Sequence, residues 1–251
     1  MSARVEIALP TALAARAAAL EQTLARVARD YAPAAFASSL SVEDMVITDV
    51  ILDCGLDIEI FTLDTERLHQ DTLDVIGAIE RRYDRSIRVI RPDPRAVAEY
   101  VDSHGLDAFY QSVELRQRCC NIRKVEPLKR ALAGKKAWLT GQRRAQSVTR
   151  AALPEQEHDA AHGIEKFNPL ADWSEDEVWT YVRAREVPYN RLYDQGYRSI
   201  GCAPCTRPVT AGEDVRAGRW WWEQPGSREC GLNVGPDGRL VRAKTAGKVT
   251  A

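Results

Sequence analysis

The 251-residue chain has little excess charge, few methionines and no long apolar run. Its 35 Lys and Arg nearly balance 36 Asp and Glu, so no overall field favours nucleic acid or a membrane as partner. No stretch approaches the roughly 20 apolar residues that span a bilayer. The alanine-rich stretch from Leu9 to Leu20 is interrupted by Pro10 and Arg16, which favours an amphipathic helix over a signal peptide. We therefore expect a cytoplasmic protein that binds neither nucleic acid nor membrane.

A glycine-rich phosphate loop is also lacking, and the four histidines show no metal-ligand spacing. The loop Ser38–Asp44 instead offers hydroxyls and backbone amides just before a predicted helix, where phosphate can bind. Ordinary capping of that helix by Ser41 is the simpler interpretation of the loop alone. Ser38 and Ser39 are nevertheless candidate substrate-binding residues.

Apolar runs alternate along the chain with segments of helical periodicity. Strands are predicted at 34–40, 57–63, 87–90 and 137–140. Helices are predicted at 11–30, 45–52, 65–82, 95–104, 114–132 (with a kink at Pro127), and after Ser174. This alternation predicts an α/β fold, a mostly parallel sheet with helices on both faces. The loops that follow strands should share one rim, where ligands bind: Ser38–Asp44, Leu63–Arg67 and Gly141–Ser147.

Two parts of the chain are expected to differ in packing. Residues 1–206 are predicted to form the α/β domain, which binds a nucleotide and a metal centre. Residues 207–251 are rich in Gly, Pro and Arg with little periodicity, which predicts a loosely packed, flexible C-terminal segment. The sequence leaves the oligomeric state open, with a homo-oligomer among the alternatives.

Basic residues concentrate in the middle of this neutral chain. Between Tyr110 and Arg150, eleven Lys and Arg face two Glu, a local balance of 11 − 2 = +9. Most of them are interpreted as a solvated face, but Gly141 is followed closely by Arg143 and Arg144. A glycine permits close backbone approach, and paired arginines can hold phosphate or sulfate through two bonds each. A surface turn with two solvated arginines is the alternative.

The cysteines are the most informative residues present. Cys119 and Cys120 are adjacent, and Cys202 and Cys205 form a CxxC pair, so four thiolates are available for one metal centre. Zinc prefers two well-spaced pairs, whereas separate irons of a cluster can each take one of two neighbouring thiolates. Two buried small side chains at 119 and 120 are the alternative, and a dithiol redox pair at 202 and 205 is another.

The other two cysteines stand alone. Cys230 lies in a Gly-flanked tail near Arg228, with Arg216 and Arg219 upstream, and these cations can stabilise a nucleophilic thiolate. An incidental tail thiol is the alternative. Cys54 ends an apolar helical segment and is expected in the core.

Seven stretches together resemble the assimilatory adenylylsulfate (APS) reductases, a family that includes the 3′-phospho-APS (PAPS) reductases. They run in family order from about residue 36: SSLSVEDMV (38–46), FTLDTERLH (61–69), CCNIRK (119–124), TGQRR (140–144), GCAPCTRP (201–208), the region of Arg216, Arg219 and Trp220–Trp222, and ECGL (229–232). The resemblance implies an adenine-nucleotide α-hydrolase-like fold. It also implies a 4Fe-4S cluster on Cys119, Cys120, Cys202 and Cys205.

The same resemblance implies a reaction. In the family the cluster accompanies use of APS, while the cluster-free branch uses PAPS. We therefore expect reduction of APS to sulfite and AMP in sulfate assimilation, through an S-sulfonate on Cys230. With no fused reductase domain, a separate thioredoxin or glutaredoxin-like protein is the expected electron donor. The cations expected to neutralise the substrate are Lys124, Arg143, Arg144, Arg216 and Arg219.

One residue departs from the family pattern. The family tail usually reads ECGLH or ECGIH, and here Asn233 replaces the histidine. Asn233 can still donate a hydrogen bond to the substrate but cannot carry charge. A PAPS reductase with the same chemistry is the nearest alternative. An adenylating enzyme of the same fold, or a non-catalytic zinc or iron–sulfur module on nucleic acid, are alternatives of other classes.

Overall fold

The computed structural model describes residues 8–146 and 150–224. A six-stranded sheet with the order β3-β2-β1-β4-β6-β5 forms its centre. The strands are β1 (Ala34–Ser38), β2 (Ile58–Leu63), β3 (Arg88–Ile90), β4 (Ala137–Leu139), β5 (Gln156–Asp159) and β6 (Ile164–Phe167). Every neighbouring pair is parallel except β5 and β6, which form an antiparallel hairpin. The predicted mostly parallel α/β sheet is thus confirmed.

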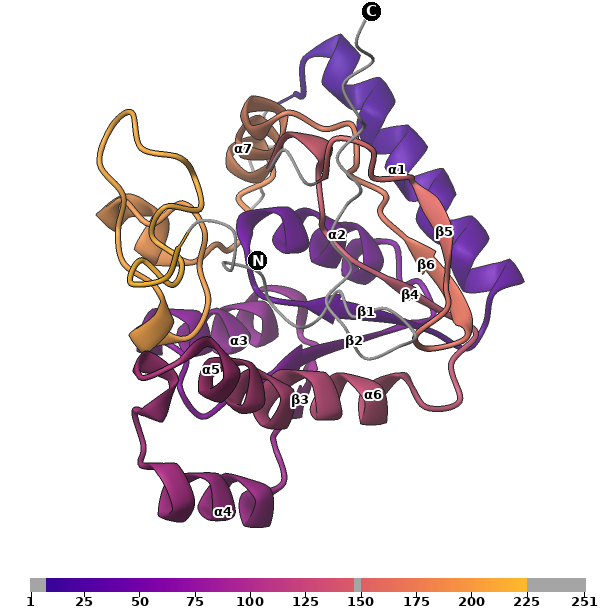
Figure 1. Cartoon of the computed structure of the whole chain (residues 1–251). Coiled ribbons are helices and arrows are strands. Elements are labelled where there is room, and N and C mark those ends of the chain that lie inside the picture. Colours follow the sequence, from indigo (N-terminus) through magenta and orange to yellow (C-terminus); the bar gives the residue numbers. More distant parts are fainter. Residues whose placement is uncertain (1–7, 147–149, 225–251) are drawn as a thin grey trace, which may run out of the picture.

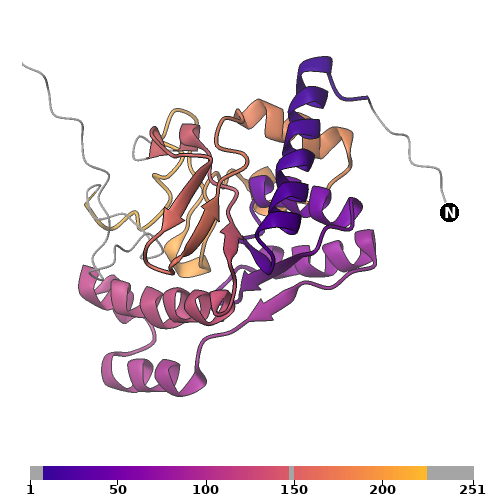
Figure 2. The ribbon, with the colours of Figure 1, turned by 90° about the vertical axis from the view of Figure 1, so that its right-hand side faces the viewer.

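Helices cover both faces of this sheet. They are α1 (Thr11–Asp30), α2 (Val42–Asp53), α3 (Gln70–Tyr83), α4 (Pro94–His104), α5 (Val113–Cys120), α6 (Glu126–Leu132) and α7 (Glu175–Ala184). Figure 1 shows α2 and α7 on one side of β1 and β2, with α6 on the other side. Figure 2 shows α1 running along the sheet on the side of α2. Within the described parts of the chain, no helix is long and apolar enough to cross a membrane.

Alternate strand residues point to opposite faces and build two separate cores. Phe36 of β1 packs in the larger core with side chains of α1, α2, α3 and α7. Its neighbour Ala35 packs in the smaller core with Leu128 and Leu132 of α6. The sheet is therefore buried on both sides, which explains why β1 and β4 are almost entirely apolar.

The strand order reverses direction between β1 and β4. From β1 the chain moves outward through β2 to β3, and β4 then returns to the other side of β1. A crevice forms outside the carboxyl ends of the strands at such a switch point, and ligands bind there in open α/β sheets.

The long helix predicted at 114–132 is interrupted. Helix α5 ends at Cys120, a wider helical turn follows at Asn121–Val125, and α6 then begins. The backbone stays helical from Cys120 to Glu126, and Pro127 lies in the first turn of α6, directly after the wider turn. The regular hydrogen-bond pattern therefore changes just before the proline, as at other breaks inside helices.

Two further expectations need correction. Cys54, expected in the core, caps the end of α2 and is exposed. The loose packing predicted from residue 207 does not extend to 218–220 and 223, which are buried: Trp220 is 1% exposed, and Gly218 O accepts from Arg207 N at 3.0 Å. Cys230 and Asn233, with the rest of 225–251, lie outside the described residues.

Candidate functional site

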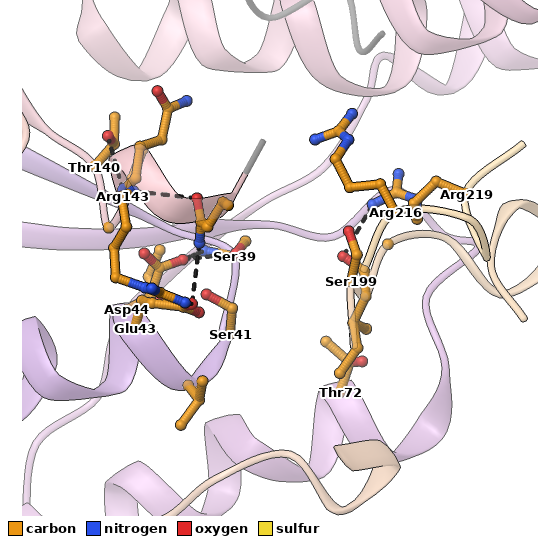
Figure 3. Close-up of a pocket in the computed structure, with 18 of the residues that line it drawn as sticks. Ser39, Ser41, Glu43, Asp44, Thr72, Thr140, Arg143, Ser199, Arg216 and Arg219 are labelled. Atoms are coloured by element: carbon orange, nitrogen blue, oxygen red, sulfur yellow. Dashed lines mark hydrogen bonds and ion pairs between the residues drawn. The ribbon is translucent and has the colours of Figure 1, made fainter. Parts of the chain in front are cut away.

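A cavity of about 390 Å³ opens beyond the carboxyl ends of the central strands. Its lining includes Ser38 and Ser39 at the end of β1, Leu63 and Thr65 at the end of β2, and Gly141 after β4. The three loops that we expected to share one rim therefore do so. Figure 3 shows two groups of side chains facing each other across this space, one with Ser39, Glu43, Asp44 and Arg143 and the other with Ser199, Arg216 and Arg219.

The first group is organised around Asp44 in the first turn of α2. Both the backbone N–H and the hydroxyl of Ser39 donate to Asp44 Oδ2 at 2.6 Å. Burial raises the pKa of Asp44 to about 6, although the two bonds from Ser39 oppose that shift. Gly141 permits this arrangement, because a Cβ at that position would lie 2.2 Å from Asp44 Oδ1. Ser41 occupies the N-cap position of α2, but its side chain makes no capping bond.

The two arginines after β4 point in different directions. Arg143 lines the cavity, and its guanidinium is bound by Glu43 Oε1 at 2.8 and 3.0 Å and by Trp173 O at 3.2 Å. Arg144 instead pairs with Asp172 and donates to Leu153 O at 2.7 Å. The expectation that both grip one anion together does not match this geometry. The charge of Arg143 is balanced within the fold by a buried carboxylate.

Further cations form a cationic wall of the cavity, which Arg150 and Arg198 also line. Lys124 comes from the turn between α5 and α6, and Arg216 and Arg219 come from the C-terminal segment. Arg219 is 8% exposed, its Nη1 donates to Ile200 O at 3.1 Å, and its Nε has no partner among the described residues. Gly201 makes room for it, because a Cβ there would lie 2.4 Å from Arg219 Nη2. These cations make that wall suited to an anionic ligand.

The cysteines of the predicted metal centre lie beside this cationic wall. Cys119, Cys202 and Cys205 pack in one cluster with Phe109 and Trp220. The loop Asp64–Leu68 holds the CxxC segment, through a bond of 3.2 Å between Thr65 Oγ1 and Cys202 Sγ and a backbone bridge from Leu68 to Cys202. Cys120, the next residue of α5, is buried and within hydrogen-bonding reach of Arg116.

Burial governs the chemistry of these thiols. It raises the pKa of Cys205 to about 12, assisted by Cys202, and it also raises the pKa of Cys119. The charge of Lys124 lowers the pKa of both thiols, so its ammonium lies within electrostatic reach of each sulfur. Without a bound cation these groups stay protonated at neutral pH, and a metal would have to displace their protons. Among the described residues, no three His, Cys, Asp or Glu side chains meet closely enough to hold a single metal ion.

Several residues in or behind this site had no signal in the sequence. The buried pair of Arg116 and Glu223 joins segments 107 residues apart, at 2.8 and 2.9 Å. Gly201 lies in the stretch GCAPCTRP and Thr65 in FTLDTERLH, but only the fold reveals the contact of Gly201 with Arg219 and the bond of Thr65 to Cys202.

The shifted pKa of Asp44 leads to a prediction about stability. Because the native pKa is raised to about 6, ionisation of Asp44 weakens the fold as pH rises from about 4 to 6. Asp44→Asn removes that loss and can still accept from Ser39. We expect its free energy of unfolding to exceed that of the parent by on the order of 2 kcal/mol at pH 7.5. At pH 4 the difference should disappear, and urea unfolding at both pH values measures it; a variant less stable at pH 7.5 would contradict the assignment.

A doubly wound sheet with a polar cavity at its switch point defines a nucleotide-binding type of α/β protein. Comparison with known proteins identifies which type. Residues 33–208, more than half of the chain, match the family described as phosphoadenosine phosphosulfate reductase domain. The chain is 58% identical to the adenosine 5′-phosphosulfate reductase of Allochromatium vinosum, over 90% of this chain and 86% of that one. The corresponding protein of Neisseria meningitidis serogroup A is 56% identical, over 91% and 94%. The chain therefore belongs to the APS/PAPS reductase family.

Solved structures agree with this assignment. A phosphoadenylyl-sulfate reductase of Candida auris, in a phosphate complex, superposes with a TM-score of 0.64 at 28% identity. That match covers 81% of this chain and all of the other. An FMN adenylyltransferase of Candida glabrata, with a TM-score of 0.52 at 14% identity over 97% of this chain and 83% of that one, shares the fold alone.

Proposed function

We propose that this chain reduces APS to sulfite and AMP in sulfate assimilation. The observation that best supports this proposal is the position of Lys124. Its side chain lines the cavity and lies within electrostatic reach of Cys119 and Cys205. One cation therefore faces both the anion site and the cysteines expected to hold a metal centre. The curated relatives named adenosine 5′-phosphosulfate reductase support APS as the substrate.

The two sides of the cavity suit the two parts of such a substrate. The loops after β1, β2 and β4 form the switch-point crevice, which is where a nucleotide binds in this class of fold. Arg216 and Arg219 lie on the opposite side (Figure 3), and together with Lys124, which also lines the cavity, they would neutralise the sulfate and phosphate oxygens. Arg143 lines the side with Ser39 and Asp44, where it pairs with Glu43, and Arg144 pairs with Asp172 and is not among the lining residues.

Cys230 is the proposed nucleophile. Its thiolate attacks the sulfur of APS, the bond between sulfur and the bridging oxygen breaks, and AMP leaves with the electron pair. Cationic side chains stabilise the charge that develops on the sulfate oxygens. Asn233 would donate a hydrogen bond to this anion in place of the usual histidine.

Release of sulfite requires two electrons from a dithiol. One thioredoxin thiolate attacks the Cys230 sulfur, forms a mixed disulfide and expels sulfite. The second thioredoxin thiol then attacks that disulfide, which returns Cys230 to a thiol and leaves thioredoxin oxidised. A glutaredoxin-like dithiol could serve in the same way. We place this reaction in the reducing cytoplasm, where exposed and buried thiols such as those of Cys54 and Cys120 persist.

Cys119, Cys120, Cys202 and Cys205 would hold a 4Fe-4S cluster. Their chemistry fits this group: all four are free thiols, and such clusters are held by four cysteine sulfurs. The buried indole N–H of Trp220, in the same cluster of side chains, has no partner among the described residues and could donate to a sulfur. When bound, the cluster would supply a fixed charge that orients and polarises the substrate anion together with Lys124.

Iron content tests the cofactor directly. The chain purified without oxygen should be brown and contain about four irons for each polypeptide. A colourless protein that contains zinc would contradict the iron–sulfur proposal and weaken the case for APS over PAPS.

Turnover of the two nucleotides tests the proposed substrate. With thioredoxin and its reductase supplied, we expect the rate of sulfite release from APS to exceed that from PAPS by at least about 100-fold. The physical reason is that the additional 3′-phosphate must be paired to be bound, and an unpaired charged group loses several kcal/mol. Faster release from PAPS would show the alternative PAPS reductase to be correct. Adenylation without sulfite release would indicate an adenylating enzyme.

A further inference from the structure

A fully buried ion pair lies behind the cationic wall of the cavity. Arg116 of α5 is 0% exposed, and it binds both carboxylate oxygens of Glu223, from Nε at 2.8 Å and from Nη2 at 2.9 Å. Both charges are removed from water, and the two parallel bonds fix the orientation of the two groups. Among the described residues, the cavity lining includes Arg219 and Trp220 but neither member of this pair.

Trp220 connects the pair to the cavity. The guanidinium carbon of Arg116 lies 4.8 Å from the centre of its indole ring, and that of Arg219 lies 4.5 Å from the same ring. Trp220 has a φ of 43°, a conformation that a tryptophan adopts only when its surroundings impose it. The backbone supplies part of that restraint, because Trp220 N donates to Cys205 O and Glu223 N donates to Trp220 O.

Arg219 depends on this ring for its direction. One terminal nitrogen donates to Ile200 O, and its Nε has no partner among the described residues. A long side chain held by so few polar contacts would sample several rotamers unless a flat surface supported it. The indole provides that surface, and Arg116 and Glu223 hold the indole.

We propose that Arg116 and Glu223 are positioning residues, which fix Trp220 and through it aim the Arg219 guanidinium at the substrate anion. This inference rests on the proposed function, in which Arg219 binds an anionic group of APS. Loss of the Glu223 carboxylate then acts on substrate affinity only through Arg219. If the pair only stabilised the fold, its loss would have the same effect whether or not Arg219 is present.

A double-mutant cycle on APS binding separates these two possibilities. The variants are Glu223→Gln, Arg219→Ala and their combination, each with Cys230→Ser so that APS is not consumed, and calorimetry measures the dissociation constant. We expect Glu223→Gln to weaken APS binding about 10-fold when Arg219 is present. In the Arg219→Ala background the same change should weaken binding less than about 2-fold. Equal losses in both backgrounds, or no loss in either, would overturn the proposal.

Four companion measurements make the cycle decisive. Glu223→Asp retains the carboxylate and should recover part of the affinity, while KM rises more than kcat falls in Glu223→Gln with Cys230 intact. Glu213→Gln is the matched control, because Glu213 pairs with Arg207 through two oxygens in the same segment but is exposed; it should leave APS binding unchanged. Thermal unfolding confirms that each variant is folded at the assay temperature. A parent chain that binds APS but releases no sulfite would contradict the proposed function alone, and the binding cycle would still test the positioning role.

Discussion

Replacing Cys230 by serine is expected to abolish sulfite release from APS, by at least about 10⁴-fold. A serine hydroxyl is scarcely ionised at neutral pH and cannot form the sulfur–sulfur bond that the reaction requires. Incubated with APS and no reductant, the parent should gain the mass of one sulfonate on the tryptic peptide spanning residues 229–239. The variant should gain none, and added thioredoxin should remove the group from the parent with release of sulfite.

Cys54 offers a matched control for that experiment. It is an exposed thiol at the end of α2, and burial together with nearby Glu21 raises its pKa, which disfavours the reactive thiolate. Cys54→Ser should therefore retain full activity and the sulfonate on Cys230. If Cys230→Ser remained active, or if the sulfonate appeared on Cys54, the proposed chemistry would be wrong.

The sequence predicted the architecture well because local patterns determine it. Helix α1 has the predicted bounds, Thr11–Asp30, and β2 differs from the prediction by one residue. Parallel strands place their carboxyl ends at one edge, so the shared rim of three loops followed from strand order alone. The hairpin of β5 and β6 was not predicted, because QEHD and IEKF are too short and polar to stand out.

The contacts of the site that the sequence did not predict join segments that lie far apart in the chain. A sequence pattern cannot reveal that Arg143 meets Glu43, or that Arg116 meets Glu223, because the paired residues lie 100 and 107 positions apart in the chain. Both arginines lie in the basic stretch that we interpreted mainly as a solvated face, yet they are 4% and 0% exposed. Among the described residues, six of its eleven positive charges pair with carboxylates from outside that stretch: Arg116, Arg118, Arg123, Lys135, Arg143 and Arg144.

The segment 207–224 shows a second reason why the sequence did not predict all of the site. Its composition predicted loose packing, but Trp220 and Arg219 are nearly buried and Thr206 forms a bridge with Arg219. Single aromatic and charged anchors hold this segment, and such anchors produce no periodicity. The same anchors bring the arginines of this segment to the cavity. The packing that the sequence did not predict therefore also forms the cationic wall.

Gly201→Ala should reduce kcat/KM for APS by about 100-fold, even though the substitution adds only a methyl group. That methyl carbon would lie 2.4 Å from Nη2 and 2.5 Å from Cζ of Arg219, so the guanidinium must move. Loss of one correctly placed donor to a developing anion typically reduces the rate by about 10² to 10³. The free energy of unfolding should change little, because the displaced atoms are the far end of a flexible side chain rather than backbone.

Gly77→Ala is the matched control for this final prediction. Its added methyl would also approach an arginine, Arg81 Nη1 at 3.2 Å, but on α3 and away from the cationic wall. We expect it to leave steady-state kinetics with APS unchanged, whereas Gly201→Ala raises KM and lowers kcat. If Arg219 binds the substrate, Gly201→Ala should cause little further loss in an Arg219→Ala background, because the group it displaces is already absent. A full additional 100-fold loss there would mean that Gly201 serves the substrate or the CxxC segment directly, and that Arg219 is not the residue through which it acts.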